Sequence, residues 1–540
     1  MSPKARVLML GLDGMTFKVL GPAFAAGHMP ALKSLLDRGV SGTLTSTVPP
    51  YTPPGWTSIF TGVNPGRHGI FGFMLGNVQR DEGLVRLDRV AAPAIWNMAN
   101  AQGSRVGIFN VPMTYPPPPV DGWAVSGMLT PEGGGHTPKG FTHPSDLADV
   151  VAGVAGGYEI DIDVDYDEDW KSTAIEDRLS TNLAKKRKAL SYLLQEQDNV
   201  DILFAVFEAP DRIMHVHYKY MAEDCEHFHR SEGAAARARI WAFLDELDGA
   251  IADLVAWAGD GGYVVTMSDH GFGPKDKAFN VNVALREWGF LSLKGLGGLG
   301  SSGGIRKAAR AVKSRLPKSV QQRAKSASQR TIDWSKTRAF SAPIPQQGIY
   351  VNLKGREPMG IVDPADYEAV RDEIVVRLEA LVDPDDGLPV VDRVYRREEV
   401  MKGSEAERAA DLFPVCRGYS YELFDGIYSV SVLGDTRELP RGFHHMDGIF
   451  GLAGPGIEPS SGHTAHLYDI APTSLYLAGL KVPPMDGEVL TRLLPALSAQ
   501  HPVRTEQMDL PNAGAGAVQG PYSAAEEAEI EESLRNLGYL

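Results

Sequence analysis

Seven polar residues from distant parts of the chain could together form a metal-dependent hydrolytic centre. They are three Asp, three His and one Thr: Asp13, Thr52, Asp211, His215, Asp269, His270 and His444. Carboxylate and imidazole ligands without thiolates suit catalytic Zn²⁺, Mn²⁺ or Fe²⁺ and not a structural zinc site. The residue types therefore predict a phosphohydrolase with two divalent metal ions beside a nucleophilic hydroxyl.

Two short segments bring candidate ligands into pairs. Asp211 and His215 in PDRIMH are four residues apart, so on a helix both side chains lie on one face and can bind one ion. His217 is six residues from Asp211 and lies on another part of the helix, so we rank His215 first. In SDHG, the glycines that follow let the chain leave a strand and turn both Asp269 and His270 towards one ion.

The segment YTPPGWTS contains the candidate nucleophile. Pro53 and Pro54 are typical of a helix start and make Thr52 the expected N-cap. Free N–H groups at a helix start also bind phosphate, and a hydroxyl bound to a divalent ion loses its proton more easily. Thr52 could therefore be both cap and nucleophile, although an N-cap hydroxyl taken alone is usually structural.

Three predicted strands position the acidic residues. The apolar runs 7–12, 202–207 and 263–267 are typical of buried parallel strands, and a helix is expected over about residues 236–257. Asp13, Asp211 and Asp269 each follow one of these strands within about four residues. An Asp after a strand is most often a turn residue. Because ligands of α/β sheets bind beyond the carboxyl ends of the strands, we nevertheless expect these three to meet in one crevice.

The composition is that of a large enzyme. The chain has 540 residues, 43% hydrophobic and 22% charged, enough for more than one structural unit. A formal net charge of −15 disfavours specific nucleic-acid binding. Two cysteines without CxxC spacing support neither a disulfide framework nor a thiolate metal site. We see no secretory leader and no membrane-spanning run, so we expect a cytoplasmic location.

Several motifs resemble one family almost from end to end. They are LGLDG, TPPGWTSIFTGVNPGRHGIFGF, PDRIMH, SDHGFGP, IYVNLKGREPMGIV, GFHHMDGIFGLAGPGI and DIAPTSLYLAGLKVPPMDGEVL. The chain resembles the alkaline phosphatase superfamily, specifically its type I phosphodiesterase and nucleotide pyrophosphatase branch, and more closely a bacterial group of predicted phosphohydrolases or phosphomutases. The resemblance implies an α/β fold, a three-layer αβα sandwich with a mostly parallel central sheet and an inserted cap.

The resemblance also implies a role for each candidate residue. One ion is expected to bind the nucleophile and three further ligands: Thr52, Asp13, Asp269 and His270. The other ion is expected to have three ligands: Asp211, His215 and His444. His444 is preferred to its neighbour His445 because of its spacing to the following strand. Zn²⁺ is the expected metal, with Mn²⁺ and Fe²⁺ as alternatives, and Gly14 and Trp56 are expected to contact the substrate.

The implied reaction is hydrolysis of a phosphodiester or phosphoanhydride in a small molecule, through a phosphothreonine on Thr52. Nucleotide pyrophosphatases of the family have a phosphate-binding Asn three residues after the nucleophile, where this chain has Gly55, so the resemblance is weaker for substrate than for mechanism. The alternatives are a phosphomutase or phosphomonoesterase on the same two-metal core, and a non-catalytic binding protein of this fold. The absence of a C/S-x-P-x-R pattern at Thr52 disfavours a sulfatase.

We predict five segments: catalytic core 1–290, a basic insertion or lid 291–335, a cap 336–440, core 441–500, and a linker with a C-terminal helix 501–540. Residues 294–332 contain ten Lys or Arg and no acid, typical of a solvated loop or of a patch for an anionic substrate or lipid surface. Ser523 and Glu526 form a capping-box pattern for the last helix, which we expect to end at Gly538 and to dock on the core or another subunit. The oligomeric state is not predicted.

Overall fold

The computed structural model describes residues 5–132, 138, 140–162, 164, 174–197, 199–294, 332–341, 348–427, 429, 431–517, 520 and 522–537. The basic insertion predicted over residues 294–332 therefore lies almost wholly outside the described residues, and its contact with anionic lipid stays a prediction, as does the cytoplasmic location. Among the described helices, none is both long and apolar enough to cross a membrane.

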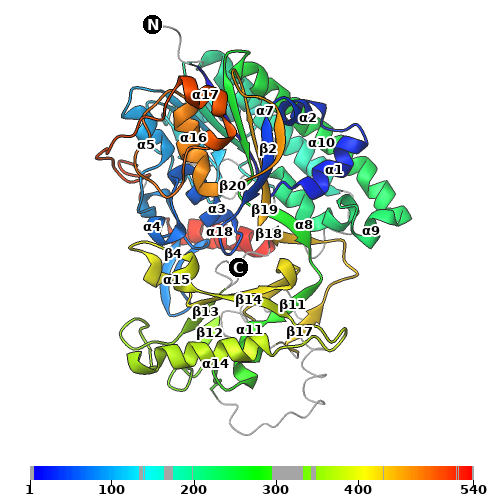
Figure 1. Cartoon of the computed structure of the whole chain (residues 1–540), viewed down its shortest axis with the longest axis vertical. Coiled ribbons are helices and arrows are strands. Elements are labelled where there is room, and N and C mark those ends of the chain that lie inside the picture. The colour runs from blue at the N-terminus through cyan, green and yellow to red at the C-terminus, as the bar shows by residue number, and fades with distance from the viewer. Residues whose placement is uncertain are drawn as a thin grey trace.

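A nine-stranded sheet forms the centre of the larger part of the molecule, at the top of Figure 1. Its strands, in order across the sheet, are β20 (Ser460–His466), β2 (Val40–Thr45), β19 (Asp447–Ala453), β9 (Tyr263–Met267), β1 (Val7–Leu12), β8 (Ile202–Phe207), β5 (Val106–Val111), β6 (Gly122–Ser126) and β7 (Thr142–His143). Strands β9, β1, β8, β5 and β6 are parallel, whereas β19 and β7 are antiparallel to their neighbours. The predicted mostly parallel sheet is confirmed.

The three strands that precede the acidic residues have the bounds predicted from the sequence. β1 and β8 are buried along their whole length because helices cover both faces of the sheet, which explains their continuous apolar sequences. Val7 of β1 is in register with Ile202 on one side and with Tyr263 on the other. The carboxyl ends of β8, β1 and β9 therefore lie side by side.

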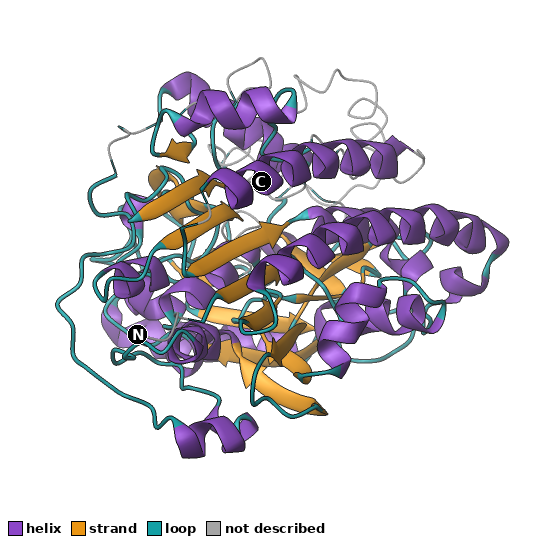
Figure 2. Ribbon diagram, turned by 90° about the horizontal axis from the view of Figure 1, so that it is seen from above, coloured by secondary structure: helices purple, strands orange, loops and turns teal. Residues whose placement is uncertain are grey.

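Helices cover both faces of this sheet, and Figure 2 shows the resulting three-layer αβα arrangement. On one face lie α2 (Pro30–Asp37) and α10 (Ser231–Ala258), which includes the helix predicted over 236–257. On the other face lie α3 (Thr52–Thr61), α5 (Ile95–Asn100) and α16 (Ile470–Leu477). The larger part also contains α1 (Phe17–Ala25), α4 (Pro65–His68), α6 (Leu147–Ala155), α7 (Ala174–Glu196), α8 (Ala209–Met221), α9 (Glu226–His229) and α17 (Pro495–Gln500).

A smaller part, the cap, lies below the sheet in Figure 1 and has a hydrophobic core of its own. Its strands are β11 (Lys277–Asn280), β12 (Ala339–Ser341), β13 (Ile349–Val351), β14 (Val391–Arg396), β15 (Leu412–Cys416), β16 (Tyr421–Phe424) and β17 (Leu433–Asp435). Its helices are α11 (Val281–Glu287), α14 (Tyr367–Glu379) and α15 (Arg397–Val400). Its hydrophobic core includes Phe279, Val281 and Phe290, which belong to the segment 1–290 that we predicted as the first part of the catalytic core.

Two small sheets and the last helix complete the fold. β3 (Met74–Asn77) pairs with β4 (Arg80–Leu84), and β10 (Gly271–Pro274) pairs with β18 (Gly442–His445). The helix α18 (Ala524–Asn536) has the predicted capping box, in which Ser523 and Glu526 bond each other's backbone N–H groups. Ile530 and Leu534 of α18 belong to the main hydrophobic core, so this helix docks on its own chain. The predicted helix end, Gly538, lies outside the described residues.

Candidate metal centre

The structure brings the candidate ligands together at the carboxyl edge of the large sheet. Asp13 directly follows β1, and Asp269 follows the neighbouring strand β9. Each lies two residues beyond the paired residues Gly11 and Met267. Asp211 lies in the first turn of α8, the helix that begins after β8. His444 comes from β18, where it is paired with Phe272 of β10, the strand that continues the SDHG segment. Residues far apart in sequence thus meet because neighbouring parallel strands end at the same edge.

One group of donor atoms surrounds the Nε2 atom of His270. Asp13 Oδ1 lies 3.6 Å and Asp269 Oδ2 lies 3.3 Å from this nitrogen. Thr52 Oγ1 lies 3.3 Å from it. Neither Asp13 Oδ1 nor Asp269 Oδ2 has a hydrogen-bond partner among the described residues. These four residues are the set that the family resemblance implied for one ion.

The second group surrounds Asp211 Oδ1. His444 Nε2 lies 3.2 Å and His215 Nε2 lies 3.4 Å from this oxygen, and the two nitrogens are 2.9 Å apart. His270 Nε2 lies 4.0 Å from the same oxygen, and it forms a compact triple of possible ligands with Asp211 and His444. His270 therefore lies between the two groups, while His215 lies beside the second group.

These separations suit metal coordination. Tetrahedral Zn²⁺ with ligand bonds of about 2.0–2.1 Å places neighbouring ligand atoms about 3.3 Å apart. The separations within both groups, from 2.9 to 3.6 Å, lie around that value. The described donor sets therefore have a chemistry and spacing that could hold divalent metal.

Backbone carbonyls fix which nitrogen of two histidines faces each group. Because a carbonyl only accepts, His444 Nδ1 donates to Pro50 O at 3.2 Å, and His270 Nδ1 donates to Gly271 O at 3.1 Å. In a neutral imidazole, this makes Nε2 the nitrogen that can bind a metal. The Thr52 hydroxyl can donate to this acceptor nitrogen of His270, whereas the oxygens of Asp13 and Asp269 that face it need either a proton or a cation between them.

Burial and mutual charge shift the titration of the whole centre. Burial, with the charges of Asp269 and Asp211, raises the pKa of Asp13 well above its ordinary value. Burial likewise raises the pKa of Asp269 to about 8. Burial lowers the pKa of His444 to about 4 and also lowers the pKa of His215 and His270. Burial opposes ionisation of Asp211, but His215, His444 and Arg212 together hold its pKa well below the ordinary value.

Thr52 is buried and lies one position later in its helix than predicted. Tyr51 is the N-cap of α3 and Thr52 is the first helical residue. The expectation that several backbone N–H groups at this helix start could bind phosphate is also wrong. Pro53 and Pro54 have no N–H, and the Gly55 N–H donates to Tyr51 O at 2.8 Å. The first turn therefore offers a phosphate the Thr52 amide and not several donors, and the ions would have to neutralise most of the phosphate charge.

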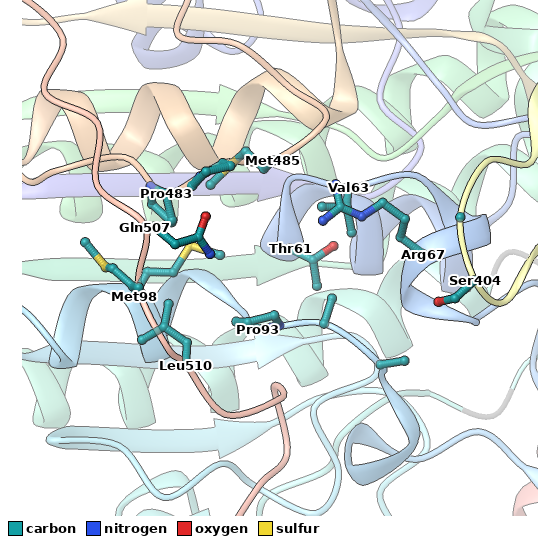
Figure 3. Close-up of a pocket in the computed structure, with 15 residues that line it drawn as sticks. Thr61, Val63, Arg67, Pro93, Met98, Ser404, Pro483, Met485, Gln507 and Leu510 are labelled. Atoms are coloured by element: carbon teal, nitrogen blue, oxygen red, sulfur yellow. The ribbon is translucent and has the colours of Figure 1, made fainter.

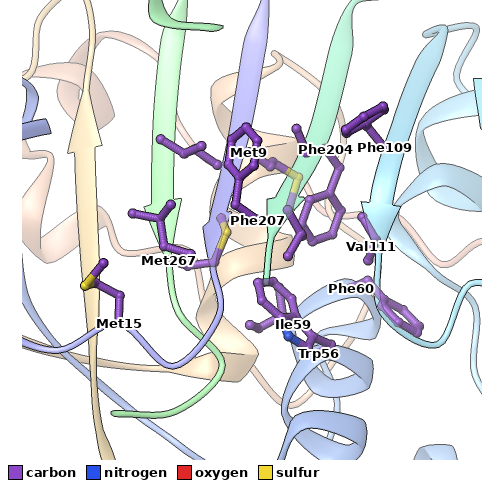
Figure 4. Close-up of a cluster of buried hydrophobic side chains, with 14 of the residues drawn as sticks. Met9, Met15, Trp56, Ile59, Phe60, Phe109, Val111, Phe204, Phe207 and Met267 are labelled. Atoms are coloured by element: carbon purple, nitrogen blue, oxygen red, sulfur yellow. The ribbon is translucent and has the colours of Figure 1, made fainter. Parts of the chain in front are cut away.

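Gly14 and Trp56, for which substrate contact stays a prediction, each donate a hydrogen bond to a carboxylate of the first group. The Trp56 indole is completely buried and donates to Asp13 Oδ2 at 3.1 Å. Figure 4 shows its side chain, with those of Ile59 and Phe60, between α3 and the side chains of the sheet. The Gly14 N–H donates to Asp269 Oδ1 at 3.2 Å, and its φ of +68° favours glycine. Both residues therefore hold a carboxylate in place.

Sequence reasoning missed Arg212, a buried cation beside the centre. Its Nη1 donates to Asp211 Oδ2. Its position directly after a candidate ligand was visible in PDRIMH, but a surface position is the usual expectation for arginine.

A cavity of about 390 Å³ lies at the other end of α3 and contains none of the candidate ligands (Figure 3). Thr61, the last residue of α3, and Arg67 line it together with methionines and prolines. A ten-residue helix is about 15 Å long, so this cavity is remote from Thr52.

Comparisons with known proteins show the family and the fold of this chain. Residues 7–422 match the family described as type I phosphodiesterase / nucleotide pyrophosphatase. No curated protein matches the chain. Phosphonoacetate hydrolase from Sinorhizobium meliloti 1021, solved with phosphonoformate, has a TM-score of 0.53 and 19% identity, covering 88% of this chain and 96% of that chain. The same enzyme with phosphonoacetate has 20% identity at the same TM-score and coverage. Murine ectonucleotide pyrophosphatase / phosphodiesterase 5 covers 91% of this chain and 99% of its own, with 14% identity and a TM-score of 0.48. The likeness to the hydrolase shows a shared fold.

Proposed function

This chain belongs to the type I phosphodiesterase / nucleotide pyrophosphatase family of the alkaline phosphatase superfamily and is a hydrolase of phosphoester bonds, and from this premise we propose how it acts. Our proposal is that it cleaves a phosphodiester or phosphoanhydride in a small molecule through a covalent phosphothreonine on Thr52. Two divalent ions, Zn²⁺ in the first instance, would be held by the two donor groups. The observation that carries the proposal is the position of Thr52 Oγ1, 3.3 Å from the nitrogen around which Asp13 and Asp269 gather.

When bound, the ions would favour the alkoxide form of Thr52 and neutralise charge on the phosphate oxygens. The Thr52 oxygen then attacks phosphorus in line, and the bond from phosphorus to the leaving oxygen breaks. Asp211, His215 and His444 would hold the ion that stabilises the charge developing on the leaving oxygen. Water next attacks the phosphothreonine, releases the product and restores the Thr52 hydroxyl, so two inversions retain configuration at phosphorus.

The chain's own residues hold this arrangement before substrate arrives. Trp56 and Gly14 each bond one carboxylate oxygen of the first group and leave the other facing His270. The Pro50 carbonyl orients His444. Binding substrate therefore requires little rearrangement of the ligands, which is what pre-organised electrostatic catalysis needs.

The test is turnover of bis(p-nitrophenyl) phosphate by Thr52→Ala in the zinc-loaded protein. We expect kcat to fall on the order of 10³-fold or more, because the nucleophile is lost, with unchanged zinc content. Thr52→Ser, which keeps a hydroxyl, is the matched control and should retain measurable turnover. Undiminished turnover by Thr52→Ala would rule out the covalent step.

A second substrate separates the alternatives. Preference for the diester over p-nitrophenyl phosphate supports the proposed diesterase, whereas the reverse preference supports a phosphomonoesterase. Phosphonoacetate belongs in the same assay because the structural relative was solved with that ligand. No turnover of any of these by wild-type protein carrying two ions would favour a binding protein of this fold.

A further inference from the structure

Arg212 is a buried cation that joins a metal ligand to a second carboxylate. Only 1% of its surface is exposed, and its Nη1 donates to Asp211 Oδ2. Its Nε lies 3.0 Å and its Nη2 lies 2.6 Å from Asp161 Oδ2, and Nε also lies 3.3 Å from Asp161 Oδ1. One guanidinium thus bridges the carboxylates of Asp211 and Asp161.

The helix alone would not produce this contact. Adjacent residues on a helix point in directions about 100° apart, so Arg212 does not naturally face Asp211. The ion pair with Asp161 draws the guanidinium to one side, where a planar fork can bond both carboxylates at once. Asp161 therefore decides where Arg212 lies.

Asp161 is itself held firmly. Its N–H and that of Ile160 donate to Glu132 Oε1, at 3.4 and 2.9 Å. Lys186 Nζ donates to Ile160 O at 2.7 Å and also pairs with Glu208, the residue before α8. The segment that carries Asp161 is therefore tied to the start of the helix that carries Asp211.

We propose that Arg212 is a positioning residue for the second ion: held by Asp161, it fixes one oxygen of Asp211 and so directs the other towards His215 and His444. This deepens the proposed function and rests on its two-ion site. With Oδ2 engaged by Arg212, Asp211 offers Oδ1 alone, 3.2 Å from His444 Nε2. Without that contact, the carboxylate is free to turn and to leave the geometry that the two histidines share.

The test is zinc binding by Arg212→Lys, measured by metal analysis and by competition with a chromophoric chelator. Lysine keeps the positive charge and loses the planar fork, so a change in affinity reports geometry and not charge. Residues that orient metal ligands typically contribute about 10- to 100-fold in affinity, and we expect a loss of that size for one ion of the two. His444→Ala, which removes a ligand of the second ion, identifies the binding phase concerned.

Arg187→Lys is the matched control. Arg187 pairs with Asp253 at an exposed position, so this substitution makes the same chemical change away from the metal centre. It should bind both ions as wild type does. If Arg212→Lys also binds both ions with wild-type affinity, or weakens both equally, the inference is overturned. If that variant does not fold, Asp161→Asn decides by the same two criteria. Fewer than two ions in wild-type protein would instead refute the two-ion part of the proposed function.

Discussion

Zinc binding should expel protons from the buried carboxyl groups around His270. In metal-free protein, burial raises the pKa of Asp269 to about 8, so at pH 7 Asp269 is largely protonated, and burial also raises the pKa of Asp13 above its ordinary value. A ligand carboxylate must lose its proton to bind metal. With a pKa of about 8, Asp269 gives up about 0.9 proton at pH 7 and about 0.1 at pH 9.

The second group should release few protons at pH 7, because its histidines are already neutral and Asp211 is already ionised. Asp269 alone therefore accounts for a release of about one proton at pH 7, declining as pH rises, and the raised pKa of Asp13 can only add to it. Since protons compete with the ion, zinc affinity should increase with pH up to about 8, by about tenfold per unit for each proton displaced.

Calorimetric titration with zinc in buffers of different ionisation enthalpy measures this release. Asp269→Asn is the control, and its release at pH 7 should be smaller by about one proton. No net release by wild-type protein at pH 7, or equal release by wild type and Asp269→Asn, would refute the reasoning.

Two further predictions concern the support of the centre. Trp56→Phe removes the hydrogen bond to Asp13, so we expect zinc affinity at the first group to fall about 10- to 100-fold. Chelator competition measures this loss, and the second ion, which should stay bound, is the internal control. Unchanged affinity would mean that Trp56 only fills space. Leu534→Ala, in the docked face of α18, should lower the free energy of unfolding by about 2–5 kcal/mol, measured by urea titration. The control Glu532→Ala, at an exposed position of the same helix, should change it by less than about 0.5 kcal/mol. Equal effects of the two substitutions would contradict the docking of α18.

Much of the centre was predictable because its ligands follow strands with unmistakable apolar sequences. The bounds of β1, β8 and β9 came directly from those runs, and the order of parallel strands explains why Asp13, Asp211 and Asp269 meet. The start of the cap at Phe279 was not predictable, because β11 looks like any other short strand until its partners β16 and β17 are known.

Other features depend on contacts that local sequence does not encode. The bond from Trp56 to Asp13 spans 43 positions, and the ion pair of Arg212 with Asp161 spans 51. The shortage of N–H groups at the start of α3 was different, since Pro53 and Pro54 already implied it. The prediction used the general property of a helix start and did not allow for the missing N–H groups of these two prolines.

Anomalous diffraction from crystals of the zinc-loaded protein, recorded above and below the zinc absorption edge, tests the account most directly. We predict two zinc peaks, one among Asp13, Asp269, His270 and Thr52, and one among Asp211, His215 and His444. A single peak, or zinc bound away from Thr52, would contradict the two-ion centre.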